Sequence, residues 1–445
     1  MITRRSFTVP LHRRSVLAGL AGTVLVTAQG RAQPAGATRP TIPLALRAGP
    51  VRRALRADGP DSELWMLERV GTAGQPAFRR GDTVAVTFQN ELPVPAVLNW
   101  YGLDGAPDAE PLLTRGPVAP GGHETITLRL THAGTLLCDA RLLGDGQARA
   151  TGALALIVGE DGLSADRDEV LLIEDWRLRA DGGAVAPGAA SEAAAPIYTI
   201  NAQSLRDIPL RPNQRMRFRF INGCQRNVIA LKIETHDVRV MTIDGRPAEP
   251  FLARDGQLML APGTRIDAII DATVAPGSSA QILLHDGSNT LPIARLVTSG
   301  EPVRAAPLPT PSALPSNGLP DQIDLRNALR VDLAIDRAAE ANWIAAAQFS
   351  PATAPAFRVK RNRAVVLALT NRATIPVTFH LHGHHFRLLD RLDDGWKPFW
   401  LDTLVVGPGQ TQRIAFKAET AGRWLMESMA ADWNAPRLVR HYVVE

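Results

Sequence analysis

The chain has 445 residues, of which 45% are hydrophobic and 21% are charged, a composition typical of a soluble globular protein. This length exceeds what one ordinary hydrophobic core organises, so we expect two or three domains. The formal net charge of +5 equals the five arginines of residues 1–32, which contain no Asp or Glu, so the remaining chain is neutral. A neutral chain has no electrostatic basis for binding nucleic acid or an anionic membrane surface.

The first 32 residues are predicted to be a signal peptide. Arg13 and Arg14 precede an apolar run over residues 15–28, and Ala32 suits a cleavage site. The run is shorter than the roughly 20 residues that cross a bilayer, so we expect no membrane span in the mature protein. A twin arginine before a mildly hydrophobic segment resembles a substrate of the twin-arginine translocase, with an ordinary secretory signal as the alternative. Both interpretations predict export, and we place the protein in the periplasm.

A turn followed by an alternating strand that ends in Asn occurs three times, at residues 80–90, 212–222 and 361–371. Such alternation is typical of a half-buried strand in an antiparallel sheet. Each copy is followed by a Pro-Gly turn and a second alternating strand, at residues 125–130, 265–271 and 411–418. In the first and third copies an Ala-Gly turn then precedes one more strand. Three copies of an all-β unit predict three Greek-key barrels or sandwiches in tandem.

The composition of the connecting segments sets the expected domain boundaries. Residues 300–320 are rich in Pro, Ala and Ser and are interpreted as a linker. The predicted organisation is a first domain at 40–165, a second at 166–300, a linker at 301–325 and a third domain at 326–445. Cys138 and Cys224 fall in different predicted domains, so we expect two buried free thiols, with a disulfide as the alternative in an exported protein.

Four of the ten histidines lie in the eight residues 379–386, within a predicted strand. His380 and His382 are two residues apart, so on a strand both side chains lie on one face. Two imidazoles on one face can bind one metal ion. A strand that only fills a core would carry Val or Ile at these positions.

The order of these elements resembles the three-domain multicopper oxidases, which are built from cupredoxin-like β-barrels. The resemblance covers nearly the whole mature chain and rests on motifs at residues 81–84, 99–102, 260–267, 380–384 and 421–425. It implies an all-β fold of three cupredoxin-like domains.

The same resemblance implies where copper ligands should lie. The four segments of the three-copper cluster correspond to Asn99-Trp100-Tyr101, Asp139-Ala140-Arg141, His380-Leu381-His382 and Glu427-Ser428-Met429, and the blue-copper histidines to Val377 and Trp433. Only His380 and His382 match the family pattern. Four coppers would require ten histidines, whereas the chain without His12 of the signal has nine. We therefore predict a degenerate, copper-free member with no catalytic residues and no expected cofactor.

Two interpretations of the remaining polar group stay open. His380, His382 and Glu427 could hold one divalent metal, so that copper at low occupancy or in a single residual site is the alternative to none. Otherwise Arg141 pairs with Asp139 or Glu427 while the histidines donate hydrogen bonds. Met426 and Met429 are interpreted as core packing, with a Cu(I) site as the alternative. His384 and His385 are interpreted as loop residues or residues that support the ligands.

Three functions follow from these interpretations. The first is a non-catalytic periplasmic scaffold or interaction protein, similar to the SufI type of copper-free relative that is associated with cell division and the envelope, with periplasmic protein partners that the sequence does not identify. The second is a copper-dependent oxidoreductase of the multicopper oxidase family. The third is a periplasmic mononuclear metal-binding protein that uses His380 and His382.

Overall fold

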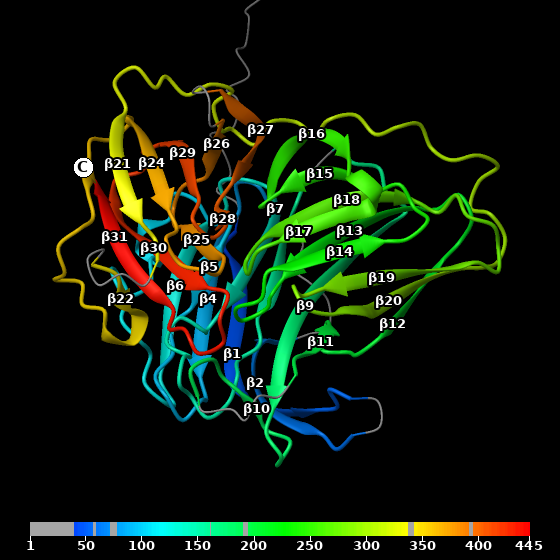
Figure 1. Ribbon diagram of the computed structural model, residues 1–445, viewed down its shortest axis with the longest axis horizontal. Coiled ribbons are helices and arrows are strands. Elements are labelled where there is room, and N and C mark those ends of the chain that lie inside the picture. The colour runs from blue at the N-terminus through cyan, green and yellow to red at the C-terminus, as the bar shows by residue number, and fades with distance from the viewer. Residues whose placement is uncertain are drawn as a thin grey trace, which may run out of the picture. The chain divides into compact units, whose positions relative to one another are not determined.

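The computed structural model describes residues 40–445 except 57–58, 72–77, 161, 190–194, 337–341 and 391–394. The predicted signal peptide at 1–32 lies outside the described residues. The regular secondary structure of the described residues is almost entirely β-strand, arranged as three successive pairs of sheets (Figure 1). Within it, no helix has the length and hydropathy that crossing a membrane requires.

The first pair of sheets has four strands in each sheet, in the orders β2-β1-β4-β6 and β3-β8-β7-β5. Buried apolar side chains of both sheets form one cluster, so the pair is a sandwich. The elements are β1 (Ile42–Arg53), β2 (Ser62–Val70), β3 (Phe78–Arg79), β4 (Thr83–Asn90), β5 (Asn99–Tyr101), the 3-10 helix η1 (Pro107–Ala109), β6 (His123–Arg129), β7 (Gly134–Asp139) and β8 (Leu154–Gly159).

The second pair contains a sheet β10-β9-β13-β18-β15-β16, with β11 also paired to β9, and a sheet β12-β20-β19-β14-β17. Its elements are β9 (Arg167–Leu178), β10 (Ala184–Val185), β11 (Ile197–Ile200), β12 (Arg206–Leu210), β13 (Arg215–Asn222), β14 (Ile229–Ile233), β15 (Arg239–Ile243), β16 (Arg246–Leu252), η2 (Arg254–Gly256), β17 (Gln257–Leu260), β18 (Arg265–Asp271), β19 (Ser279–His285) and β20 (Thr290–Thr298).

The third pair contains a sheet β21-β24-β29-β26-β27 and a sheet β22-β31-β30-β25-β28, with β23 also paired to β31. Its elements are β21 (Leu329–Ala334), β22 (Ile344–Ala345), η4 (Ala346–Gln348), β23 (Arg358–Val359), β24 (Ala364–Thr370), β25 (Val377–Leu381), β26 (Phe386–Leu389), β27 (Trp396–Leu401), β28 (Thr403–Val406), β29 (Thr411–Lys417), β30 (Gly422–Ala430) and β31 (Leu438–Val444). The predicted all-β fold class is confirmed.

The asparagine that ends each repeated strand has the same role in all three sandwiches. The side-chain amide of Asn90 donates to the carbonyls of Val94 and Val118 at 2.9 and 2.8 Å, and its Oδ1 accepts from the backbone of Leu92. Asn222 and Asn371 form the equivalent three bonds. The Asn side chain therefore holds the turn that follows the strand and satisfies buried carbonyls. This explains why the repeat ends in Asn.

The repeated strands lie where the sequence predicted them. β4, β13 and β24 pair antiparallel with β6, β18 and β29, which are the strands after the three Pro-Gly turns. Alternation is clearest in β4, where Val84, Val86 and Phe88 are buried. Both cysteines are buried free thiols, as predicted.

Candidate functional site

The candidate site is positioned by two pairs of strands that repeat one arrangement. In the third sandwich β25 pairs with β30, and His380 lies opposite Glu427. In the first sandwich β5 pairs with β7, and Asn99 lies opposite Asp139. This register supports the correspondence between Asn99 and His380 on which the sequence analysis relied. All four side chains are buried.

His380 is a neutral imidazole with one nitrogen satisfied. Its Nδ1 lies 3.1 Å from the carbonyl of Asp402 and 3.2 Å from Oγ1 of Thr403. Its Nε2 is buried and has no hydrogen-bond partner among the described residues. The Tyr101 ring packs against it with the centroids 4.3 Å apart. Burial, followed by the nearby His382, lowers the pKa of His380 to about 4, so the ring is uncharged at neutral pH.

His382 follows β25 directly and lies between two carboxylates. Its Nδ1 is 2.9 Å from Oε1 of Glu110, and its Nε2 is 2.8 Å from Oε1 of Glu427. Carboxylates only accept hydrogen bonds, so both ring nitrogens must donate. Burial favours the neutral ring, but Glu110 and then Glu427 outweigh it and raise the pKa of His382 to about 10. His382 is therefore an imidazolium, and neither nitrogen has a free lone pair.

Glu427 connects this histidine to a buried arginine. Its Oε1 also accepts from the Asn99 amide at 2.9 Å, and its Oε2 accepts from Nη1 of Arg437 at 3.2 Å. Burial would raise the pKa of Glu427, but Arg437 and His382 hold it well below its usual range. Arg437 also lies 4.0 Å from Asp139. The group is a buried chain of alternating charge.

The three residues proposed as metal ligands do come together. One ligand atom from each of His380, His382 and Glu427 lies within 4.8 Å of the other two, and this is the one such group in the described part of the chain. The His380 and His382 rings have centroids 4.6 Å apart, as expected for side chains on one face. The distances suit a small cation, whereas the protonation of His382 and the nearness of Arg437 oppose one.

The predicted pairing of Arg141 with Asp139 or Glu427 is wrong. The chain turns after β7, where Asp139 accepts the backbone N–H of Arg141 at 3.0 Å. The Arg141 side chain instead extends to β9, where Nη2 donates to Glu174 at 2.5 Å, and its other nitrogens donate to the carbonyls of Thr151 and Gly223. Arg437, not Arg141, is the arginine that pairs with Glu427 and lies beside Asp139.

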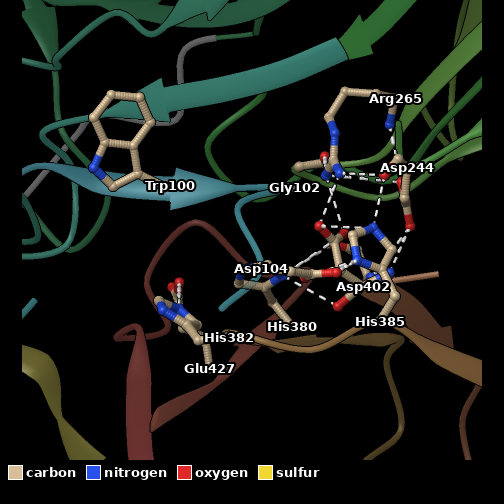
Figure 2. A network of polar contacts seen from close by, with 12 residues as sticks. Trp100, Gly102, Asp104, Asp244, Arg265, His380, His382, His385, Asp402 and Glu427 are labelled. Carbon is tan, nitrogen blue, oxygen red and sulfur yellow. Dashed lines mark hydrogen bonds and ion pairs between the residues drawn. The ribbon is translucent and has the colours of Figure 1, made fainter. Parts of the chain in front are cut away.

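The residues that the family resemblance set at the other expected ligand positions have the contacts of core residues. The Ser428 hydroxyl donates to the carbonyl of Ile335 at 2.5 Å. Val377 and Met429 are buried, and Met429 lies opposite Thr378. Trp433 is buried, with a guanidinium carbon of Arg177 4.5 Å from its ring centroid. Trp100, the middle residue of β5, lies away from the two histidines (Figure 2).

A second buried network, absent from the sequence analysis, joins the three sandwiches (Figure 2). The Nδ1 of His385 lies 2.8 Å from both oxygens of Asp104, and its Nε2 lies 2.8 Å from the carbonyl of Asp244. Arg265 of β18 donates to both oxygens of Asp402, at 3.0 and 2.8 Å. The backbone of Asp402 donates to Asp244 at 3.1 Å. His385 therefore supports the contact between sandwiches, as a loop residue with its own partners.

His384, the other loop histidine, is buried beside the C-terminal strand. Its Nδ1 lies 2.7 Å from the hydroxyl oxygen of Tyr442 and donates to it, because the single Tyr442 O–H proton is donated to the carbonyl of His382 at 2.7 Å. Burial lowers the pKa of His384 to about 4. Both loop histidines thus have structural partners, and local sequence gives no signal for them because those partners are distant along the chain.

Comparisons with known proteins agree with this architecture. The chain is 23% identical to the multicopper oxidase MmcO of Mycobacterium tuberculosis over 403 residues, which cover 78% of this chain and 76% of that protein. It is 27% identical to Laccase-3 of rice (Oryza sativa) over 223 residues, which cover 44% of this chain and 38% of that protein. A crystal structure of a multi-copper oxidase from Pseudomonas thermotolerans superposes with a TM-score of 0.75 and 24% identity, covering 91% of this chain and all of that one.

The matches to protein-family models assign the family more strongly than these individual relatives do. Two models described as multicopper oxidase match residues 165–280 and 323–445, which together make up more than half of the sequence. The matched segments contain the second sandwich from β9 to β18 and the strands that carry His380 and Glu427. The three sandwiches, the repeated strand pairs and these matches lead to one conclusion: the chain belongs to the multicopper oxidase family.

Proposed function

We propose that this protein uses the multicopper oxidase fold without four-copper chemistry, as a non-catalytic scaffold or interaction protein in the periplasm. One observation carries the proposal: both ring nitrogens of His382 are bound by carboxylates, Glu110 and Glu427, at 2.9 and 2.8 Å. A copper ligand needs a free imidazole lone pair. His382 is one of only two histidines that match the family's ligand pattern.

The donor set around this position does not fit the copper centres that the family implies. Blue copper needs a thiolate and two imidazoles. Cys138 and Cys224 are buried, and burial raises the pKa of both thiols well above the usual value. Ser428 stands where the resemblance places the ligand cysteine, and its hydroxyl is already bonded to a backbone carbonyl. We therefore derive no electron-transfer or oxygen-reducing step for this chain.

A mononuclear metal site is the second candidate, and one observation favours it. The buried Nε2 of His380 has no partner among the described residues and lies within 4.8 Å of ligand atoms on His382 and Glu427. To bind through all three, the protein would have to remove a proton from His382 and break its bond to Glu110. We expect His380 and Glu427 alone to hold Zn²⁺ or Cu²⁺ weakly, because Arg437 repels the cation at close range.

Elemental analysis separates these candidates. The full chain is exported in a bacterium with a twin-arginine translocase, purified and incubated with Cu²⁺ or Zn²⁺, and each metal is measured per chain after dialysis. We expect far less than one ion per chain, no blue absorption band and no oxygen consumption with a phenolic substrate. Near-stoichiometric metal that is lost in His382→Ala and kept in the exposed control His123→Ala would overturn the proposal in favour of a metal site.

The scaffold role needs its own test. Purification of tagged protein from a periplasmic extract of the native host, followed by mass spectrometry, should recover specific protein partners. The relatives that match are named as oxidases and laccases, so a copper oxidoreductase is the alternative that the family suggests. Phenol oxidation by copper-loaded protein, together with an absence of specific partners, would favour that alternative.

A further inference from the structure

A cleft of about 470 Å³ lies between the first and second sandwiches, far along the chain from the histidine pair. Its walls are mainly apolar and include Met66 of β2, Ala153 just before β8, Ala155 of β8 and Leu172 of β9. A volume of a few hundred Å³ at a junction between domains, lined by apolar groups with few polar ones, is typical of a small-molecule site.

The cleft exists because β2 parts from the second sheet of its own sandwich. Trp65 bridges β2 to the segment that leads into β8, donating to the carbonyl of Ala150 at 3.1 Å and accepting from Gly152 at 2.8 Å. After this bridge, β2 continues alongside β1, whereas the segment after Gly152 enters β8, which pairs with β7. The two segments separate, and the cleft lies between two buried clusters: Met66 belongs to one, and Ala153, Ala155 and Leu172 belong to the other.

Arg69 gives this apolar cleft a positive charge. Its Nε and Nη2 are buried and have no hydrogen-bond partner among the described residues. The acidic residues that line the cleft are paired elsewhere: Glu68 with Arg47 and Arg53, and Glu174 with Arg141. Burial lowers the pKa of Arg69, which reflects the cost of removing a guanidinium from water without an anion beside it.

In two other arginines of this protein, the guanidinium edge formed by Nε and Nη2 binds a carboxylate. Arg215 uses Nε and Nη2 to hold both oxygens of Asp271 at 2.7 Å, and Arg295 holds Asp207 in the same way at 3.0 and 2.6 Å. This fork fits the two oxygens of a carboxylate. In Arg69, which lines the cleft, the same two nitrogens are buried and form no hydrogen bond with the described residues.

We propose that this cleft binds an amphipathic monoanion, a carboxylate with an apolar chain or ring, whose carboxylate is held by the Nε and Nη2 edge of Arg69. The apolar part lies against Met66, Ala155 and Leu172. On binding, the Arg69 side chain turns its Nε and Nη2 edge, which is buried in this structure, towards the carboxylate and forms a pair of charge-assisted hydrogen bonds. The site is independent of the histidine pair, so it stands whether or not the protein binds copper.

Calorimetric titration of the purified full chain with decanoate tests this proposal, with decan-1-ol as the neutral probe and inorganic phosphate as the anion without an apolar part. We expect one decanoate per chain and little or no phosphate binding. Arg69→Gln should weaken decanoate binding about tenfold, the size expected for losing a charge-assisted hydrogen bond, and change decan-1-ol binding less than twofold. Arg295→Gln, which removes the same charge from an exposed pair, should change neither.

A second variant keeps the test informative if Arg69→Gln does not fold. Ala155→Phe fills the cleft and keeps Arg69, so it should abolish binding of both decanoate and decan-1-ol. Three results would each overturn the proposal. They are decanoate binding to wild type that does not saturate, decanoate binding to Arg69→Gln that is as tight as to wild type, and decanoate binding to Ala155→Phe that is unchanged. Tight Arg69-dependent phosphate binding without decanoate binding would also overturn it, since the apolar wall would then have no role.

Discussion

His382 and Glu427 form an ion pair between Nε2 and Oε1 at 2.8 Å, although β25 and β30 place Glu427 directly opposite His380. The offset follows from the turn after Leu381, where the backbone of His382 donates to the carbonyl of Leu425 at 3.1 Å. Glu427 therefore binds the charged histidine and leaves the Nε2 of the neutral one without a hydrogen-bond partner among the described residues. The two histidines of one motif are thus in opposite protonation states.

Replacing Glu427 by Gln should destabilise the protein strongly. The variant keeps the size of the side chain but removes the anion that lies against two buried cations, His382 and Arg437. Removing one partner of a buried ion pair costs about 3–5 kcal/mol. Urea unfolding followed by tryptophan fluorescence measures the change. Glu91→Gln, which alters a half-exposed pair with Arg47 at 3.5 Å, should cost at most about 1 kcal/mol, and equal effects would show that the buried group is not charged.

Alkaline pH should weaken the fold through His382. Its pKa is raised to about 10 in the folded protein from an ordinary value near 6.5, so the folded state holds the proton more tightly. The resulting stability is fully present below about pH 6.5 and is lost as pH rises through 10, on the order of a few kcal/mol in all. Free energies of unfolding measured from pH 6.5 to 10 should fall for wild type.

His382→Gln provides the matched comparison for this pH effect. The variant has no titrating group at this position, so its stability should depend much less on pH over the same interval. His123→Gln, on the exposed surface of β6, should retain the slope of wild type. A His382→Gln profile parallel to wild type would mean that other groups cause the alkaline loss.

The repeated strands and their terminal asparagines could be predicted because their signal is local. The alternation of apolar and polar residues over 83–90 indicates that one face of the strand is buried. The Asn90 side chain donates hydrogen bonds to the nearby carbonyls of Val94 and Val118. The position of His380 and His382 on one face is also local, since it depends only on the spacing of two residues in a strand. These features depend on local sequence alone and do not require knowledge of how the rest of the chain folds.

The partners that decide the chemistry of the site could not be predicted. Glu110, which charges His382, follows a 3-10 helix in a loop of the first sandwich, and no spacing or motif marks it. Arg437 reaches Glu427 from the segment before β31. The error on Arg141 has the same origin: the family resemblance suggested Asp139 or Glu427 as its partner, whereas the side chain extends to Glu174 in another sandwich. Long-range charge pairing depends on how the sandwiches pack.

Arg265→Met should weaken the contact between the second and third sandwiches. Arg265 is fully buried and holds both oxygens of Asp402, and without it Asp402 and Asp244 would be two buried carboxylates side by side. Burial and Asp402 already raise the pKa of Asp244 to about 7. We expect a loss of about 3–5 kcal/mol in the free energy of unfolding.

Two further variants test the origin of that loss. The double variant Arg265→Met/Asp402→Asn removes the unpaired carboxylate as well and should recover part of the stability. Arg295→Met, in an exposed pair with Asp207, should cost at most about 1 kcal/mol. A double variant less stable than Arg265→Met would show that the arginine acts through packing and not through charge.

Any side chain at Gly383, between His382 and His384, should destabilise the fold. Its φ of +74° is in the left-handed region, and a Cβ added there would lie 2.1 Å from Cε3 of Trp424. Overpacking costs about 1–3 kcal/mol, and the unfavourable φ adds about 1 kcal/mol, so Gly383→Ala should lose about 2–4 kcal/mol in urea unfolding. Gly409→Ala is the matched control, because its φ is +65° with no atom within 4 Å of the added Cβ, and it should lose only about 1 kcal/mol. Similar losses in the two variants would mean that Trp424 moves aside easily, and that the loop carrying His382 is held by its hydrogen bonds alone.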